Sequence, residues 1–154
     1  MNYVLGIDPG KNGGMAMIRL DGKEYHCWGM ASMTYKERID QVAQVVDDVC
    51  MTYLERVGAR PNDGRSSIFK FGTDNGVWIG ALLACGVPYE LITPTKWQIG
   101  MRCLTKGDKK VTRARAQELF PKVKVTHQTA DALLIAAYCQ RKMGAIGAKV
   151  DFSA

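Results

Sequence analysis

Long apolar runs, paired cysteines and histidines are scarce or absent in this 154-residue chain. No apolar run approaches the ~18 residues that a membrane-spanning helix needs. No basic segment precedes the short apolar stretch at the start, so we expect neither a membrane span nor a signal peptide. The five cysteines include no CxxC pair, which argues against a disulfide framework and against a zinc site. We therefore expect a protein of the cell interior with reduced cysteines.

The composition is that of a folded domain with an excess of positive charge. Hydrophobic residues make up 47% and charged residues 23%, and neither a repeat nor a low-complexity block interrupts the chain. We expect one domain over residues 1–143 and a loosely held Gly- and Ala-rich tail over 144–154. The net charge of +6 favours a polyanionic partner, although the same charge would also serve solubility alone.

Hydrophobic periodicity predicts an α/β chain with a mixed central sheet of about five strands flanked by helices. A Thr34–Glu37 capping box opens the first helix, which carries apolar residues at helical spacing. The early strands are expected to pair as hairpins, and the later ones to arrive through helical crossovers. We expect strands over 2–8, 15–20, 25–28, 51–57 and 89–92, a polar loop over 58–67, a charged loop over 105–110, and further helices around 78–83, over 111–120 and over 129–142.

Carboxylates stand at positions that otherwise belong to the core. Asp8 ends a buried strand, Glu55 interrupts an apolar segment, and Asp131 opens the last helix with His127 four residues earlier. Each has an ordinary structural interpretation: a turn cap or buried ion pair for Asp8, an outward-facing strand position for Glu55, and a favourable helix dipole for Asp131. A histidine in such a place is also more often structural than a ligand.

Taken together, the three acids suggest a shared metal site. Two strand ends and one helix start, brought from distant segments, would supply the oxygen ligands that Mg²⁺ prefers. Two such ions ~3.5–4 Å apart activate a water and stabilise the leaving oxygen of a phosphodiester. Without a cation, the clustered carboxylates would repel one another and retain protons.

Five sequence blocks then resemble one family, the RuvC-type Holliday-junction resolvases, and in particular their phage and organelle branch. That family has an RNase H-like fold. The resemblance covers roughly residues 3–142 and depends on all five blocks occurring in order, since the first block alone is weak. The blocks are Gly6–Gly10, Leu54–Val57 with Ser66–Gly72 as a DNA-facing loop, Thr93–Trp97, Glu118–Pro121, and Ala130–Ala136.

The resemblance implies that Asp8, Glu55 and Asp131 are catalytic metal ligands, with Mg²⁺ as cofactor and two ions per site. Many members place a further acid just upstream of the last ligand. Here that stretch reads Thr126–Thr129 and contains no acid, so His127 is the expected fourth ligand. An imidazole would also suit Mn²⁺.

The same resemblance implies DNA contacts. Phe69 and Phe71 flank Lys70, and one aromatic, preferably Phe69, would wedge between unstacked bases at a junction centre. The alternative is that both are core residues beside an exposed lysine. Lys109 corresponds to a family lysine near the scissile phosphate, where it could stabilise transition-state charge. Further expected DNA contacts are Lys96, Lys110 and Arg113, with Arg60, Arg65 and Arg115 nearby, although a solvated helix face is the usual reason for such runs.

The resemblance implies a crossover junction endodeoxyribonuclease that cuts four-way DNA as a homodimer, in a bacterial or phage-infected cell or in an organelle. Trp78, Ile79 and Leu82 are either the dimer contact or core. An RNase H-like nuclease for hybrid or other branched nucleic acids and a non-catalytic junction-binding protein are the alternatives. A nucleotide cofactor is not expected, because actin-like ATPases need a second domain.

Overall fold

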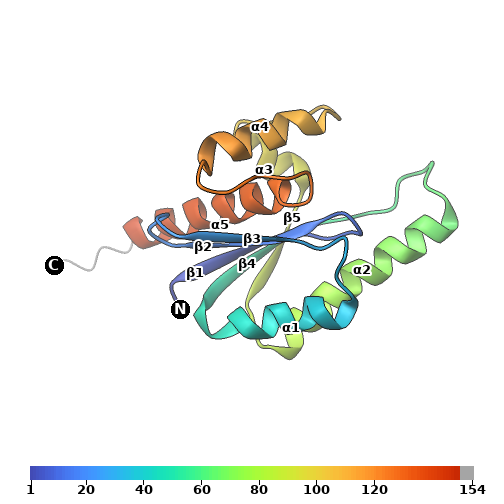
Figure 1. Ribbon diagram of the computed structural model, residues 1–154, viewed down its shortest axis with the longest axis horizontal. Helices are drawn as coiled ribbons and strands as arrows, with labels where there is room; N and C mark the ends of the chain where they lie inside the picture. Colours follow the sequence, from blue (N-terminus) through green and yellow to red (C-terminus); the bar gives the residue numbers. More distant parts are fainter. Residues whose placement is uncertain (150–154) are drawn as a thin grey trace.

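The computed structural model describes the backbone of residues 1–149 and the side chains of residues 1–145. A five-stranded sheet with the order β3-β2-β1-β4-β5 forms its centre (Figure 1). β1 pairs antiparallel with β2, and β2 with β3, whereas β1–β4 and β4–β5 are parallel. The predicted mixed sheet is thereby confirmed. The strands are β1 (Tyr3–Asp8), β2 (Gly14–Arg19), β3 (Tyr25–Gly29), β4 (Val49–Glu55) and β5 (Tyr89–Ile92).

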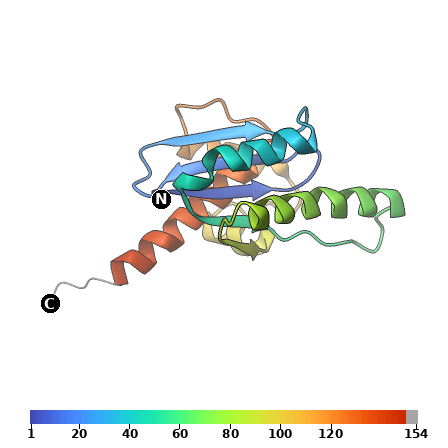
Figure 2. The same cartoon turned by 90° about the horizontal axis from the view of Figure 1, so that it is seen from below.

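Helices cover both faces of the sheet. α1 (Tyr35–Val45) and α2 (Arg65–Ala84) lie on one face, and α3 (Pro94–Gly100), α4 (Lys109–Leu119) and α5 (Ala130–Lys149) lie on the other (Figures 1 and 2). The predicted capping box opens α1, and a short 3-10 turn, Val46–Asp48, leads from α1 into β4. No helix among the described residues has the length and apolar character needed to cross a bilayer.

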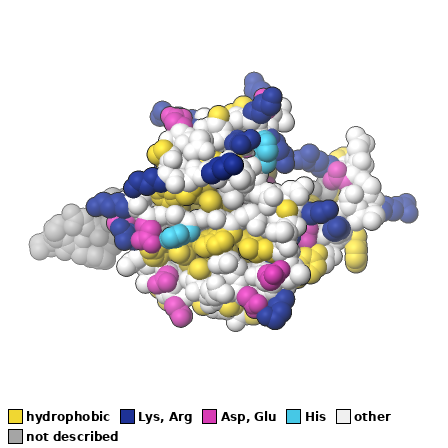
Figure 3. Space-filling view, in the orientation of Figure 1, with side chains coloured by type: hydrophobic (Ala, Val, Ile, Leu, Met, Phe, Trp, Pro, Cys, Tyr) yellow, Lys and Arg dark blue, Asp and Glu magenta, His cyan; other side chains and the backbone are white. Residues whose placement is uncertain are grey.

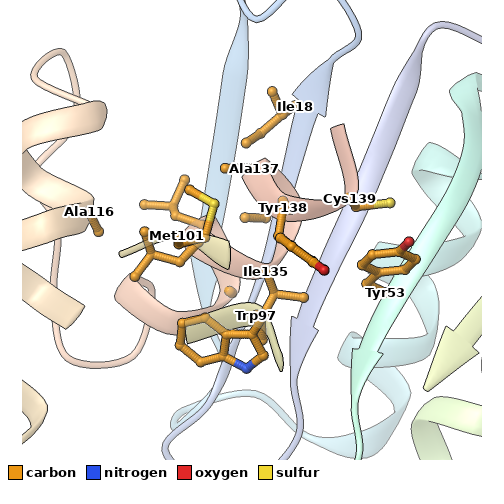
Figure 4. Packing of buried hydrophobic residues seen from close by; sticks show 14 of the residues in the cluster. Ile18, Tyr53, Trp97, Met101, Ala116, Ile135, Ala137, Tyr138 and Cys139 are labelled. Carbon is orange, nitrogen blue, oxygen red and sulfur yellow. The ribbon is translucent and has the colours of Figure 1, made fainter. Parts of the chain in front are cut away.

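The two layers of the core follow from the alternation of side chains along the strands. Ala16 and Ile18 face α5, whereas Met15 and Met17 face α1 and α2. Because successive strand residues point to opposite faces, a sheet covered on both sides needs apolar residues at consecutive positions. Figure 4 shows the α5 side, where Trp97 of α3 and Met101 pack among α5 and strand residues.

The main departure from the sequence-based expectation is α2. It begins at Arg65, so the segment 66–72 is helical rather than a loop, and it stays helical through Ala84. The helical period is concealed in its first half because the one buried residue there is the polar Asp74. The helix α3 was not expected, although Thr93 followed by Pro94 is a recognised helix start.

The ends of two other elements also differ. α4 begins at Lys109, two residues earlier than expected, because Asp108 caps it by accepting from the Lys110 N–H. α5 continues to Lys149, past the expected end at Lys142. Of the tail expected over 144–154, residues 144–149 are helical, and residues 150–154 lie outside the described part of the chain.

Candidate active site

Asp8 and Glu55 occupy equivalent ends of neighbouring strands. β1 and β4 are parallel, with Ile7 opposite Leu54, and each acid is the next residue and the last of its strand. Adjacent strands lie ~4.8 Å apart, so the register brings these two carboxylates to one edge of the sheet. Pro9 and Gly10, which has a φ of 135°, end β1 directly after Asp8.

Asp131 reaches the same edge because α5 lies directly on β1. A Cβ placed on Gly6 would overlap the Ala132 carbonyl oxygen and the Ala136 backbone nitrogen. Only a glycine on the strand, facing small residues on the helix, permits this approach. Asp131 immediately precedes Ala132 in the first turn of α5, and it is therefore carried to the end of β1.

The three acids act on one another electrostatically. Burial is the largest cause that raises the pKa of Asp8 well above its ordinary value, and the charges of Glu55 and Asp131 raise it further. Burial likewise raises the pKa of Glu55 to about 7; a hydrogen bond from Trp97 opposes this shift, and the Asp131 charge adds to it. The Lys109 ammonium lowers the pKa of both carboxyls. The predicted acids thus share one electrostatic neighbourhood, with Lys109 in it.

Two neighbours that sequence reasoning missed hold these acids. The Trp97 indole, fully buried on α3, donates from Nε1 to Glu55 Oε2 at 2.7 Å. Thr112, buried on α4, lies beside Asp131 and lowers its pKa, which burial raises, while its hydroxyl donates to the Lys109 carbonyl oxygen at 3.2 Å. Both residues lie on the helices that cover this edge of the sheet. Trp97 closes the Thr93–Trp97 block, and the Thr93–Pro94 helix start also marks this segment, but neither signal assigns Trp97 a role beside Glu55.

His127 lies in the turn before α5 and is exposed. Its Nε2 is 3.2 Å from Nη1 of Arg113, and because a guanidinium can only donate, His127 Nε2 is the acceptor. His127 is not among the groups that shift the pKa of Asp8, Glu55 or Asp131. In this arrangement the histidine is paired with a cation of α4.

The donor types suit a hard divalent cation. Burial and neighbouring negative charge favour protonated carboxyls, whereas a bound cation would favour the ionised carboxylates and balance their charge. Among the described residues, however, no group of three or more His, Cys, Asp or Glu side chains is gathered closely enough to hold an ion. The acids are therefore neighbours that do not form a closed cage.

A cavity of about 610 Å³ opens beside Glu55, between the segment after β4 and the first turns of α2. Arg56 and Arg60 supply positive charge to its wall and Asp63 supplies negative charge, and Phe71 and Asn75 reach it from α2. The Phe71 ring also packs against the turn after β1, since it would lie 3.1 Å from a Cβ on Gly10. The cavity thus joins a carboxylate of the site to a basic and aromatic surface.

The residues expected to contact DNA lie on three helices. Phe69 is 79% exposed on α2, where Lys70 is also exposed, whereas Phe71 is half-buried. Lys96 of α3 and three residues of α4, namely Lys109, Lys110 and Arg113, are exposed. In Figure 3, basic side chains gather over α4 and around the beginning of α2.

Comparisons with known proteins identify solved structures that have a similar fold. No family model and no curated protein matches the sequence. Among solved structures, Thermus thermophilus RuvC is similar with a TM-score of 0.60 and 21% identity, over 92% of this chain and 96% of that one. T. thermophilus RuvC in complex with a Holliday junction substrate has a TM-score of 0.63 and 18% identity, over 91% of this chain and 96% of that one. The yeast mitochondrial Holliday junction resolvase Ydc2 has a TM-score of 0.50 and 16% identity, over 97% of this chain and 82% of that one. The chain has the fold of RuvC-type resolvases, as its sequence blocks predict.

Proposed function

We propose that this chain is a metal-dependent endonuclease that resolves four-way DNA junctions. One observation carries the proposal: acids from β1, β4 and α5 meet at one edge of the sheet beside a lysine, where the Glu55 and Asp131 charges raise the pKa of Asp8 and the Asp131 charge raises that of Glu55. Such an arrangement is costly for stability alone, since buried like charges are unfavourable without a cation. The basic surface around it suits a polyanion.

Asp8, Glu55 and Asp131 are the residues that would hold divalent cations, Mg²⁺ in the first place and Mn²⁺ as an alternative. Bound there as a pair, the ions supply the activation of a water and the stabilisation of a leaving oxygen. The protein contributes orientation. Trp97 fixes one oxygen of Glu55, and Thr112 lies beside Asp131 and favours its ionised form.

The phosphate is held by the protein's own cations. Lys109, the first residue of α4, acts on all three carboxyls, and its ammonium is suited to bind a phosphate oxygen and to stabilise charge that develops in the transition state. Lys96, Lys110 and Arg113 would bind neighbouring phosphates. Phe69 is sufficiently exposed to stack on an unpaired base at the junction centre.

His127 is proposed as the fourth ligand. To act so, its Nε2 must exchange the bond from Arg113 for an ion, which releases Arg113 toward the DNA. That exchange would couple ion binding to phosphate binding.

We further propose that the active form is a homodimer, because a junction with near two-fold symmetry must be cut twice. Trp78 and Leu82 are fully buried within the monomer, so they belong to the core and are excluded as the dimer contact. Sedimentation equilibrium should give twice the monomer mass of 17.0 kDa. A monomer that makes paired cuts would contradict the dimer.

The test of the function compares a synthetic four-way junction with a linear duplex of the same sequence, with and without Mg²⁺. The wild-type protein should nick the junction only when the ion is present. Asp8→Asn should bind the junction with similar affinity and lose cleavage by a factor of at least about 10³, since a metal ligand is removed. Cleavage is followed on denaturing gels and binding by fluorescence anisotropy.

The outcomes separate the alternatives. Equal cleavage of the linear duplex would reject a resolvase, and a preference for an RNA–DNA hybrid would favour a general RNase H-like nuclease. Junction binding without cleavage by the wild type would favour a non-catalytic binding protein. An active Asp8→Asn variant would reject the mechanism.

A further inference from the structure

A second cavity, of about 360 Å³, lies next to the first along α2. On α2, Lys70 and Asp74 line this second cavity, whereas Phe71 and Asn75 line the cavity beside Glu55. Residues four apart share a helix face, so two adjoining faces of α2 serve two cavities. The second cavity is lined by Lys11, Ala31, Met33, Thr34, Tyr35, Arg38, Lys70 and Asp74.

This cavity is positively charged, and its one acid is already engaged. Arg38 is 4% exposed, and its Nη1 lies 3.5 Å from Asp74 Oδ1. The Tyr35 hydroxyl lies beside the same carboxylate, which raises the pKa of Tyr35. Lys11 and Lys70 form no ion pair among the described residues, so three cations face a single carboxylate that is shared between two partners.

Arg38 is also short of hydrogen-bond acceptors. Its Nη2 donates to the Met30 carbonyl at 3.0 Å, but Nε and Nη1 find no hydrogen-bond partner in the described part of the chain. Buried donors of this kind are costly and are rare in folded proteins.

The cavity is connected to the candidate active site by the chain itself. Lys11 follows Asp8 by three residues, in the turn that also contains Gly10. The Phe71 ring packs on that turn at Gly10, next to Lys70. One turn and one helix therefore border the acids, the first cavity and the second cavity.

We propose that the second cavity, defined by Lys11, Arg38 and Lys70, binds a backbone phosphate of the DNA strand that passes the Glu55 cavity, apart from the phosphate that is cut. This inference rests on the proposed function. A phosphodiester is the ligand because it is anionic, offers several acceptor oxygens and is repeated along the strand. The cavity would fix the register of the strand and would add one phosphate contact to the complex.

The experiment measures junction affinity against salt concentration in the presence of EDTA, so that no cleavage occurs. Lys11→Ala/Lys70→Ala is compared with the matched pair Lys23→Ala/Lys122→Ala, which removes two exposed lysines near the β2–β3 turn. All four side chains are exposed, and thermal melts check that both variants fold. In the cavity variant the slope of log K against log salt should become less steep by ~0.9, which corresponds to one phosphate contact. This variant should also bind the junction about tenfold more weakly.

The control pair should retain the wild-type slope. A slope unchanged in the cavity variant, or lowered equally in the control, would overturn the cavity proposal while leaving the nuclease proposal intact. Lysine acetylation read by mass spectrometry gives a second measure on the wild-type protein. Saturating junction should protect Lys11 and Lys70 from acetylation and leave Lys23 reactive. Lys11 and Lys70 that stay reactive in the complex would also overturn the cavity proposal. Failure of the wild type to bind junction would overturn both proposals.

Discussion

At the scale of single residues, the site depends on polar side chains that are buried beside one another. Glu55 illustrates this point, because burial and the Asp131 charge raise its pKa while the Trp97 indole lowers it. The ionised carboxylate needed for an ion is thus stabilised by one hydrogen bond from the core. That bond is open to a direct test.

Trp97→Phe removes the donor and preserves most of the ring. The pKa of Glu55 should move further above about 7, so a higher pH is required to ionise it. We expect the acidic limb of the pH–rate profile to shift upward and cleavage at pH 7 to fall about tenfold or more, since hydrogen bonds to charged groups are worth ~1.5–3 kcal/mol. Trp28→Phe, in β3, is the control. Coincident profiles for the two variants would show that the indole does not tune Glu55.

His127→Ala tests the proposed fourth ligand. If His127 holds an ion, the variant should need more metal for half-maximal cleavage by about tenfold or more, with the larger effect in Mn²⁺ because imidazole is the softer donor. Cleavage is titrated separately with Mg²⁺ and Mn²⁺. Wild-type rates at every concentration of both metals would exclude His127 as a ligand.

The sequence predicts some of these residues better than others, for a physical reason. Asp8 and Glu55 are recognisable because each stands in an otherwise apolar strand, and Asp131 because it opens an apolar helix. Trp97 and Thr112 act through helices that fold back from other parts of the chain. The bond from Trp97 to Glu55 and the position of Thr112 beside Asp131 depend on tertiary packing, which local periodicity does not encode.

At the scale of elements, the strands and α1 are predictable because their patterns are locally complete. α2 is not, because Asp74 occupies its buried side, where the ion pair with Arg38 takes the place of an apolar contact. The loop expected over Ser66–Gly72 came from the family resemblance, and this segment is helical. Its helical form matters for function, because it fixes Phe69 on a rigid element.

The contact of α5 with β1 gives an element-scale prediction. Gly6→Ala should push the α5 backbone away from β1, since the new methyl group meets Ala132 and Ala136. We expect a loss of ~1–3 kcal/mol or more in the free energy of unfolding, measured with urea. Cleavage should fall as well, because Asp131 moves with the helix.

Gly80→Ala is the control for this change. A Cβ at Gly80 of α2 meets nothing within 4 Å, and alanine favours a helix by ~1 kcal/mol over glycine. That variant should be as stable as the wild type or more so. A Gly6→Ala protein of wild-type stability would contradict the close approach of α5.

At the scale of the whole molecule, the buried acids predict how stability responds to pH. Without metal, the folded protein keeps a proton on Glu55 up to about pH 7, whereas the unfolded chain releases it near 4.5. Unfolding between these values releases a proton, so rising pH favours the unfolded state. The free energy of unfolding should fall across this window by up to ~3 kcal/mol, at 1.36 kcal/mol per pKa unit.

Urea titrations in EDTA from pH 4.5 to 7.5 measure this effect. Glu55→Gln, which cannot ionise, should lose less stability over the same range, and the remaining fall belongs to Asp8 and Asp131, whose pKa values are also raised. Mg²⁺ should restore stability at the alkaline end by binding the folded state. Parallel curves for wild type and Glu55→Gln would contradict a raised pKa at this residue.

The parallel register of β1 and β4 limits how this protein can change in length. Side chains alternate along a strand, so deleting one residue from β4 would turn Glu55 into the apolar layer and present Leu54 to the edge of the sheet. The exposed segment 58–64, which joins β4 to α2, has no such constraint and can gain or lose residues. Functional homologues should therefore vary in length between the second acid and α2, and stay constant in length within the strand that carries it.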